Sequence, residues 1–172
     1  MPLLVPFNGS SPSVDGSAWV APNATLVGAV SLAAGASAFF GTVVRADSNS
    51  IFIGERTNLQ DNVVVHVDGD APARIGSGVS VGHSAVVHGC TIEDDCLIGM
   101  NSTVLSHAVI GAGSLVAAGA VVLEGTVVPP GSLVAGVPAK VRRELTDDER
   151  AGIRANADHY AKLSQRYAAD GV

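Results

Sequence analysis

Histidines are the residues of this chain best suited to chemistry, and the positions of three of them are informative. His66 and His88 lie 22 residues apart, and each directly follows an aliphatic residue, Val65 or Val87. Neutral imidazole nitrogens are common ligands of zinc and related metals. The two histidines can share an ion only if the fold brings them together, so the pattern of the surrounding residues decides the question.

Aliphatic residues recur at every sixth position through the second half of the chain. The series is Ile92, Ile98, Val104, Ile110, Val116, Val122, Val128 and Val134, and a compact residue lies four places after each one. An α-helix needs a period near 3.6 and an isolated strand a period of two, so six fits neither alone. It is typical of a parallel β-helix of hexapeptide repeats. The sequence therefore predicts an all-β solenoid.

The same spacing continues upstream in shorter registers, and its breaks are informative. The step from Val65 to Ile75 is ten residues long and carries Asp68–Pro72, which predicts a four-residue excursion beyond a normal six. With three six-residue faces, one coil takes about 18 residues. Without the excursion, His66 and His88 are one coil apart, so we predict that they stack on one face, about 4.8 Å apart. At that distance they could converge on one metal ion.

A third histidine, His83, lies two places after Val81 on the preceding face and should point away from this pair. A cyclic trimer could supply it, because threefold symmetry sets one face of a subunit against a different face of its neighbour. Asp61 precedes His83 by 22 residues and could orient its ring. Gln60 could then bind a metal-bound water. The alternatives are surface histidines and a hydrophilic turn at Gln60–Asn62.

The remaining features predict a plain scaffold. For His107 and His159 a surface role is favoured, and Cys90 and Cys96 read as small core residues. The net charge of −6 argues against nucleic acid as a partner. We see neither a signal peptide nor a membrane span, so we expect a cytoplasmic protein.

The end of the chain follows a different pattern. Thr146-Asp147-Asp148-Glu149 is a capping box, and apolar residues then follow at helical spacing to about Tyr167. We therefore divide the chain into a β-helix with its N-terminal lead-in, residues 1–140, and a C-terminal α-helix that packs on it, residues 141–172.

Several segments together resemble the γ-class carbonic anhydrases over nearly the whole chain. They are Arg45-Ala46-Asp47, Asn58-Leu59-Gln60-Asp61-Asn62, His66, Gly82-His83 and His88-Gly89. The resemblance implies a left-handed β-helix and a homotrimer with Zn²⁺ at each interface. It also implies that His66 and His88 bind the metal from one subunit and His83 from its neighbour.

The resemblance further implies roles for the surrounding residues. Gln60 would position a metal-bound hydroxide that hydrates CO₂ reversibly to bicarbonate, with Arg45 near the anion and Tyr160 near the metal. A packing role for Tyr160 is the alternative. Asp47, Asn58 and Asp61 would support the site or the interface. Co²⁺ or Fe²⁺ could replace zinc, because both accept imidazole ligands.

Two departures from that family and one further resemblance keep other functions open. Ser48 stands where founding members carry a glutamate, and the short Asp68–Ala71 segment lacks their full acidic loop. Residues 135–140, Ala-Gly-Val-Pro-Ala-Lys, resemble the end of hexapeptide acyltransferases. The alternatives are therefore a metal-dependent acyl-CoA thioester hydrolase or a coenzyme A acyltransferase, and a non-catalytic trimeric assembly or binding protein.

Overall fold

Short strands with one buried and one outward residue build this molecule. In β13 (Leu97–Ile98), β15 (Val109–Ile110) and β17 (Val121–Val122) the second residue is buried and the first is partly exposed. Every member of the six-residue aliphatic series has at most 1% of its surface exposed. Side chains of successive strand residues point to opposite faces, so the period of six places one aliphatic residue per strand in the core.

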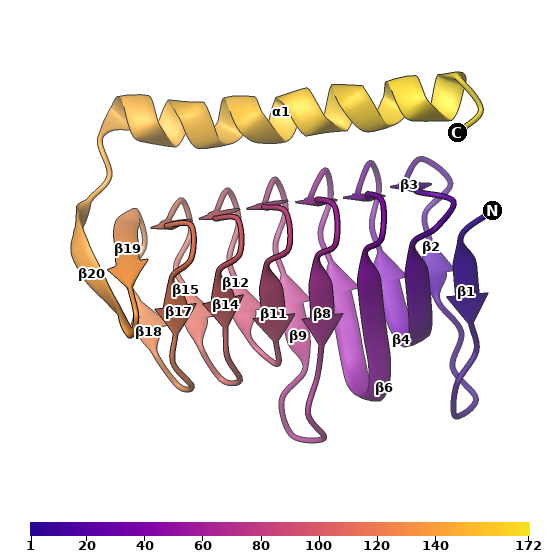
Figure 1. Ribbon diagram of the computed structural model, residues 1–172, viewed down its shortest axis with the longest axis horizontal. Helices are drawn as coiled ribbons and strands as arrows, with labels where there is room; N and C mark the ends of the chain where they lie inside the picture. Colours follow the sequence, from indigo (N-terminus) through magenta and orange to yellow (C-terminus); the bar gives the residue numbers. More distant parts are fainter.

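A computed structural model describes residues 1–172 as a coil of stacked parallel strands with one helix alongside (Figure 1). The first strands are β1 (Leu3–Val5), β2 (Ser13–Val14), β3 (Trp19–Val20), β4 (Thr25–Leu32), β5 (Ser37–Ala38), β6 (Val43–Ile53), β7 (Asn58–Leu59), β8 (Val64–His66), β9 (Ala73–Ile75) and β10 (Ser80–Val81). The others, besides β13, β15 and β17, are β11 (Val86–His88), β12 (Thr91–Ile92), β14 (Thr103–Val104), β16 (Leu115–Val116), β18 (Val127–Val128), β19 (Ser132–Gly136) and β20 (Ala139–Glu144).

The strands form two sheets that enclose the core on three sides. One sheet runs β17-β14-β11-β8-β6-β9-β12-β15-β18 and turns a corner at β6, which pairs with both β8 and β9. The other runs β20-β19-β16-β13-β10-β7-β5-β3. All pairs are parallel except β19 with β20. The structure confirms the predicted left-handed β-helix of hexapeptide repeats.

Two interruptions of the six-residue spacing have structural counterparts. The nine-residue step from Val44 to Ile53 lies within β6, which stays extended through the corner. The excursion after β8 is a hairpin closed by mutual backbone hydrogen bonds between Asp68 and Ala71, both 3.2 Å. Figure 1 shows it as the long loop between β8 and β9 at the lower edge of the coil.

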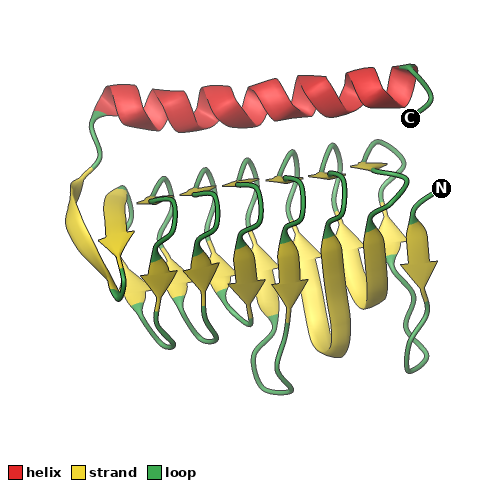
Figure 2. Ribbon diagram, viewed as in Figure 1, coloured by secondary structure: helices red, strands yellow, loops and turns green.

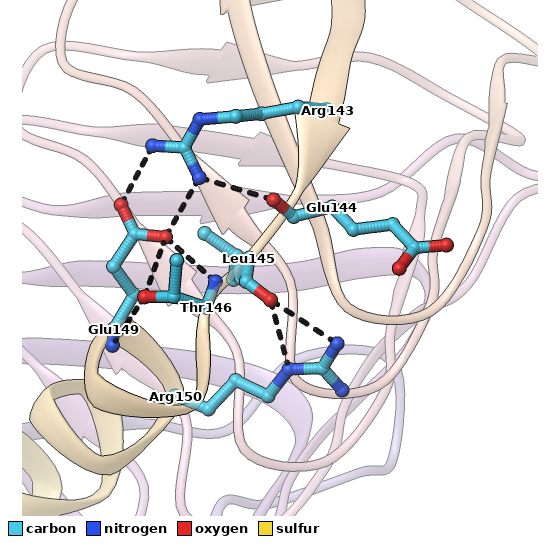
Figure 3. A network of polar contacts seen from close by, with 6 residues as sticks. All are labelled: Arg143, Glu144, Leu145, Thr146, Glu149 and Arg150. Atoms are coloured by element: carbon cyan, nitrogen blue, oxygen red, sulfur yellow. Dashed lines mark hydrogen bonds and ion pairs between the residues drawn. The ribbon is translucent and has the colours of Figure 1, made fainter.

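The helix α1 (Asp147–Ala169) lies along the full length of the coil, as Figure 2 shows in red. The predicted capping box is present: Thr146 accepts a hydrogen bond from the backbone N–H of Glu149, and the Glu149 side chain accepts one from Thr146. Arg143 also pairs with Glu149 (Figure 3). The predicted boundary at residue 140 falls within β20 (Ala139–Glu144), so the chain remains extended up to Glu144 before the helix begins. The apolar part of α1 falls short of what a membrane-crossing helix requires.

Aromatic side chains attach α1 to the N-terminal coils. Trp19 stacks on Tyr167 with ring centroids 5.1 Å apart, and Phe39 contacts Tyr160 edge to face at 5.4 Å. Such pairs contribute about 0.5–1.5 kcal/mol each beyond their buried area. Cys90 and Cys96 are free and buried, and burial raises the pKa of both thiols to about 12. Both cysteines therefore fill the core as protonated thiols.

Candidate metal centre

His66 and His88 face one another across neighbouring strands. The strands β8 and β11 pair in parallel with His66 opposite His88, so the excursion keeps the two residues in register. Nδ1 of His66 lies 2.9 Å from Nε2 of His88, and the ring centroids are 5.0 Å apart. Bonds from zinc to histidine nitrogen are about 2.0–2.1 Å long. Both nitrogens can therefore reach a single ion.

The other nitrogen of each ring is already engaged. Nε2 of His66 lies 3.0 Å from Oδ1 of Asp47, and Nδ1 of His88 lies 3.0 Å from Oγ of Ser106. An ionised carboxylate only accepts, so Nε2 of His66 donates. The Ser106 hydroxyl donates to Asp68 at 2.7 Å and therefore accepts from His88. In the neutral rings the two facing nitrogens, Nδ1 of His66 and Nε2 of His88, then both carry lone pairs. Both can therefore bind a cation that lies between them.

Asp47 connects this pair to Arg45. The Arg45 guanidinium donates to Oδ2 of Asp47 while His66 donates to Oδ1. Partial burial raises the pKa of Asp47, but the hydrogen bonds from His66 and Arg45 outweigh it, so the net pKa lies below its ordinary value. The carboxylate is therefore ionised and holds the His66 ring. In the structure the pair of Arg45 and Asp47 lies within one chain.

His83 lies after β10, in the other sheet, and does not join His66 and His88. Its Nδ1 lies 3.0 Å from Oδ2 of Asp61, and the Tyr160 hydroxyl lies 3.4 Å from Nε2. No group of three histidine, cysteine or acidic residues within the chain is placed to hold an ion. One chain therefore offers two convergent nitrogens, and a separate histidine held by a carboxylate in the same manner.

Gln60 is buried beside a pocket that opens near His83. Its Nε2 donates to Oδ1 of Asn58 at 3.1 Å, and Asn58 in turn donates to Oγ of Ser80 at 2.9 Å. The pocket has a volume of about 340 Å³. Seven of its twelve lining residues are hydrophobic, and the full set is Gln60, Gly82, His83, Leu97, Ile98, Gly99, Met100, Leu115, Val116, Ala118, Asn156 and Tyr160.

Tyr160 reaches this pocket from α1. Burial raises its pKa, and the nearby negative charge of Asp61 raises it further. The phenol therefore keeps its proton at neutral pH and can donate towards His83. The ring of the same residue also packs against Phe39, as the packing alternative predicts, while its hydroxyl faces His83.

Some residues of the site were not identified from the sequence, and two histidines lie outside it. Ser106 is 18 residues after His88, so the coil count could have placed it on the same ladder. Asp68 reaches Ser106 through the hairpin, whose path the repeat does not define. His107 lies 3.6 Å from Asp70 at the surface, and His159 packs edge to face on Tyr160.

Comparison with known proteins agrees with this architecture. Residues 89–124 match the family model "Bacterial transferase hexapeptide (six repeats)". A structure of a hexapeptide transferase family protein from Anaplasma phagocytophilum superposes with a TM-score of 0.91 and 43% identity, covering 96% of this chain and 98% of that one. The shared feature is the whole coil with its helix.

Curated relatives define the family more closely. A carbonic anhydrase of Geobacillus kaustophilus is 42% identical over 97% of this chain and 92% of its own length. Gamma carbonic anhydrase 2, mitochondrial, of Arabidopsis thaliana is 44% identical over 93% of this chain, which spans only 60% of that plant protein. Fold and histidines define a hexapeptide-repeat protein with a candidate metal centre. The chain belongs to the γ-class carbonic anhydrase family, which confirms the resemblance seen in the sequence.

Proposed function

We propose that this protein is a zinc-dependent enzyme that reversibly hydrates CO₂ to bicarbonate. The observation that carries the proposal is the pair of facing lone pairs on His66 and His88, 2.9 Å apart. Each ring is fixed through its second nitrogen, as is usual for histidines that bind metals. Membership of the γ-class family supports hydration of CO₂ as the reaction. Co²⁺ or Fe²⁺ could occupy the same ligands.

We further propose that the working unit is a homotrimer and that His83 of a neighbouring subunit completes each site. Three observations support this arrangement. The two convergent nitrogens of one chain leave a tetrahedral ion short of ligands. His83 is oriented by Asp61 in the same way that His66 is oriented by Asp47. It also lies in the turn after β10, a strand of the other sheet, so threefold symmetry could bring it to a neighbour's pair.

The residues of the chain have distinct parts in such a reaction. His66, His88 and His83 would hold the metal, whose charge lowers the pKa of water and so supplies a nucleophile at neutral pH. Because Nε2 of Gln60 is engaged by Asn58, its carbonyl oxygen is left to accept a hydrogen bond from the reacting water. The apolar part of the pocket favours CO₂ over water. Arg45 would attract the bicarbonate product.

Hydrolysis of an acyl thioester is the second candidate function, and one structural observation favours it. The pocket of about 340 Å³ is far larger than the volume of about 30 Å³ that a water molecule takes, and lies within the range of organic ligand sites. It has room for a short acyl chain. The match to transferase hexapeptide repeats also keeps a coenzyme A acyltransferase as a candidate, because such an enzyme would bind the same kind of acyl substrate.

One experiment separates these functions. CO₂ hydration and short-chain acyl-CoA hydrolysis are measured on the same zinc-loaded sample, with His88→Ala as the matched control. Hydration that is lost in the control supports the carbonic anhydrase, and thioester cleavage that is lost supports the hydrolase. Absence of both activities in a fully loaded trimer would favour a non-catalytic assembly protein and refute the proposed reaction.

A further inference from the structure

The hairpin between β8 and β9 brings an acidic side chain to His88 from a different coil. The Ser106 hydroxyl donates to Oδ2 of Asp68 at 2.7 Å, and Nδ1 of His88 lies 3.0 Å from the same hydroxyl oxygen. The direct separation of Asp68 and His88 is 3.6 Å, too long for a hydrogen bond. The hydroxyl therefore forms the link between the carboxylate and the ring.

The direction of this chain of hydrogen bonds is fixed by Asp68. An ionised carboxylate only accepts, so the single hydroxyl hydrogen of Ser106 points to Asp68. The serine oxygen can then only accept from His88, whose Nδ1 carries the proton. Nε2 of His88, the atom that faces His66, is left with its lone pair. Without Asp68, the hydroxyl could rotate and donate to Nδ1, and the opposite tautomer would place a hydrogen on Nε2.

The surrounding residues hold the hairpin in this position. Ser48 donates to the carbonyl of Val67 at 3.1 Å, and Asn49 donates to the carbonyl of Gly69 at 3.0 Å, so β6 anchors the hairpin. Gly89 has φ +53°, and a Cβ there would lie 2.9 Å from Oγ of Ser106 and 2.8 Å from Cβ of Ala71. A side chain at this position would therefore displace both the hydroxyl and the hairpin.

We propose that Ser106 and Asp68 are positioning residues that set the tautomer of His88 for metal binding. They do for His88 what Asp47 does directly for His66 and Asp61 for His83. The inference rests on the proposed role of His88 as a metal ligand. It also gives the four-residue excursion a function, because the hairpin carries a carboxylate to a histidine that has a serine, not an acid, beside it.

The decisive variant is Asp68→Ala, with Asp70→Ala as its matched control in the same hairpin, where the Asp70 carboxylate pairs with the exposed His107. Outer residues of this kind typically change metal affinity about 10- to 100-fold. We expect a loss of that size for Asp68→Ala and for Ser106→Ala in competition with a zinc chelator. The control should bind zinc as the unchanged protein does. Equal affinity in all four proteins overturns the proposal.

A second measurement needs neither metal nor activity. Nitrogen NMR of the metal-free protein, at a pH where the imidazoles are neutral, reports which ring nitrogen carries the proton. We expect the proton on Nδ1 of His88 in the unchanged protein and a mixture of tautomers in Asp68→Ala, while His66 is unaltered in both. A proton on Nε2 of His88 in the unchanged protein refutes the proposed role of Asp68 and Ser106, even if the proposed enzymatic activity is present. The expected tautomer without any CO₂ hydration would refute only the proposed function.

Discussion

His66 and His88 lie 22 residues apart in sequence, yet Nδ1 of the first and Nε2 of the second approach to 2.9 Å. The parallel register of β8 and β11 produces this contact, because the hairpin after β8 takes up the residues in excess of one coil. Asp47 and Ser106 occupy the outer nitrogens, so the facing atoms are both acceptors. Two acceptors this close repel one another unless a positive charge lies near both.

Zinc should therefore stabilise the protein through this pair. A ligand that binds only the folded state at a hundredfold excess over its Kd raises the free energy of unfolding by about 2.7 kcal/mol. We expect a rise of this order on adding zinc to the metal-free protein, measured by thermal or urea unfolding, and none in His66→Ala. The control His159→Ala, on the exposed side of α1, should respond as the unchanged protein does. A response that persists in His66→Ala would place the ion elsewhere.

His83 should link metal content to assembly. If it binds an ion held by the His66 and His88 of a neighbour, His83→Ala removes one ligand from every site and one contact from every interface. We expect lower zinc stoichiometry by elemental analysis and a weaker trimer by sedimentation. Full zinc occupancy in the variant would contradict a site shared between subunits.

Gln60 should affect turnover without affecting metal content. Its amide nitrogen is engaged by Asn58, so its role in the proposed reaction is to orient water through the remaining oxygen. Loss of such a supporting contact typically costs about 10- to 100-fold. We expect a fall of this order in kcat for CO₂ hydration in Gln60→Ala, with unchanged zinc. Loss of zinc from the variant would instead make Gln60 a structural residue.

Much of this site could be predicted by counting residues, because a coil with a fixed repeat turns sequence distance into spatial distance. The stacking of His66 on His88 followed from the period of six and one excursion, and the same count placed Asp61 next to His83. The helix start followed from local chemistry, since a capping box needs only Thr146 and Glu149.

The remainder depends on contacts that no local pattern encodes. Asp68 reaches Ser106 because the hairpin folds back along the coil and is held there by Ser48 and Asn49. The pocket beside Gln60 is lined by Asn156 and Tyr160 of α1 together with residues of β13 and β16, and aromatic pairs such as Trp19 with Tyr167 attach α1 to the coil. Both features join side chains from distant parts of the chain through tertiary hydrogen bonds and packing.

Acid should weaken the start of α1 through Glu149. Hydrogen bonds from Arg143 and from the backbone N–H of Thr146 lower the pKa of Glu149 from 4.5 to about 2 (Figure 3). Between these values the unfolded chain binds a proton that the folded chain does not, so the free energy of unfolding falls as pH drops through that window and is fully retained above it.

The substitution Glu149→Gln should remove this part of the pH dependence. Glutamine retains a capping side chain, so the helix start is preserved while the charge is lost. We expect the thermal midpoint of the variant to vary less with pH in the acid range than that of the unchanged protein. Glu144→Gln is the matched control, because Arg143 donates to the backbone carbonyl of Glu144 and its side chain points away in Figure 3. Identical acid profiles for Glu149→Gln and the unchanged protein would contradict the assignment.

Two neighbouring valines in β18 test the register of the coil directly. Val128 is 1% exposed and points into the core, whereas Val127 is 71% exposed. Val128→Ala leaves a cavity and should lower the free energy of unfolding by about 2 kcal/mol, as other losses of buried methyl groups do. Val127→Ala should change it by less than about 0.5 kcal/mol, as surface substitutions usually do. Because a one-residue slip would exchange the two faces, a larger cost at Val127 in urea unfolding would show that the chain winds in another register and that the stacking of His66 on His88 must be reassigned.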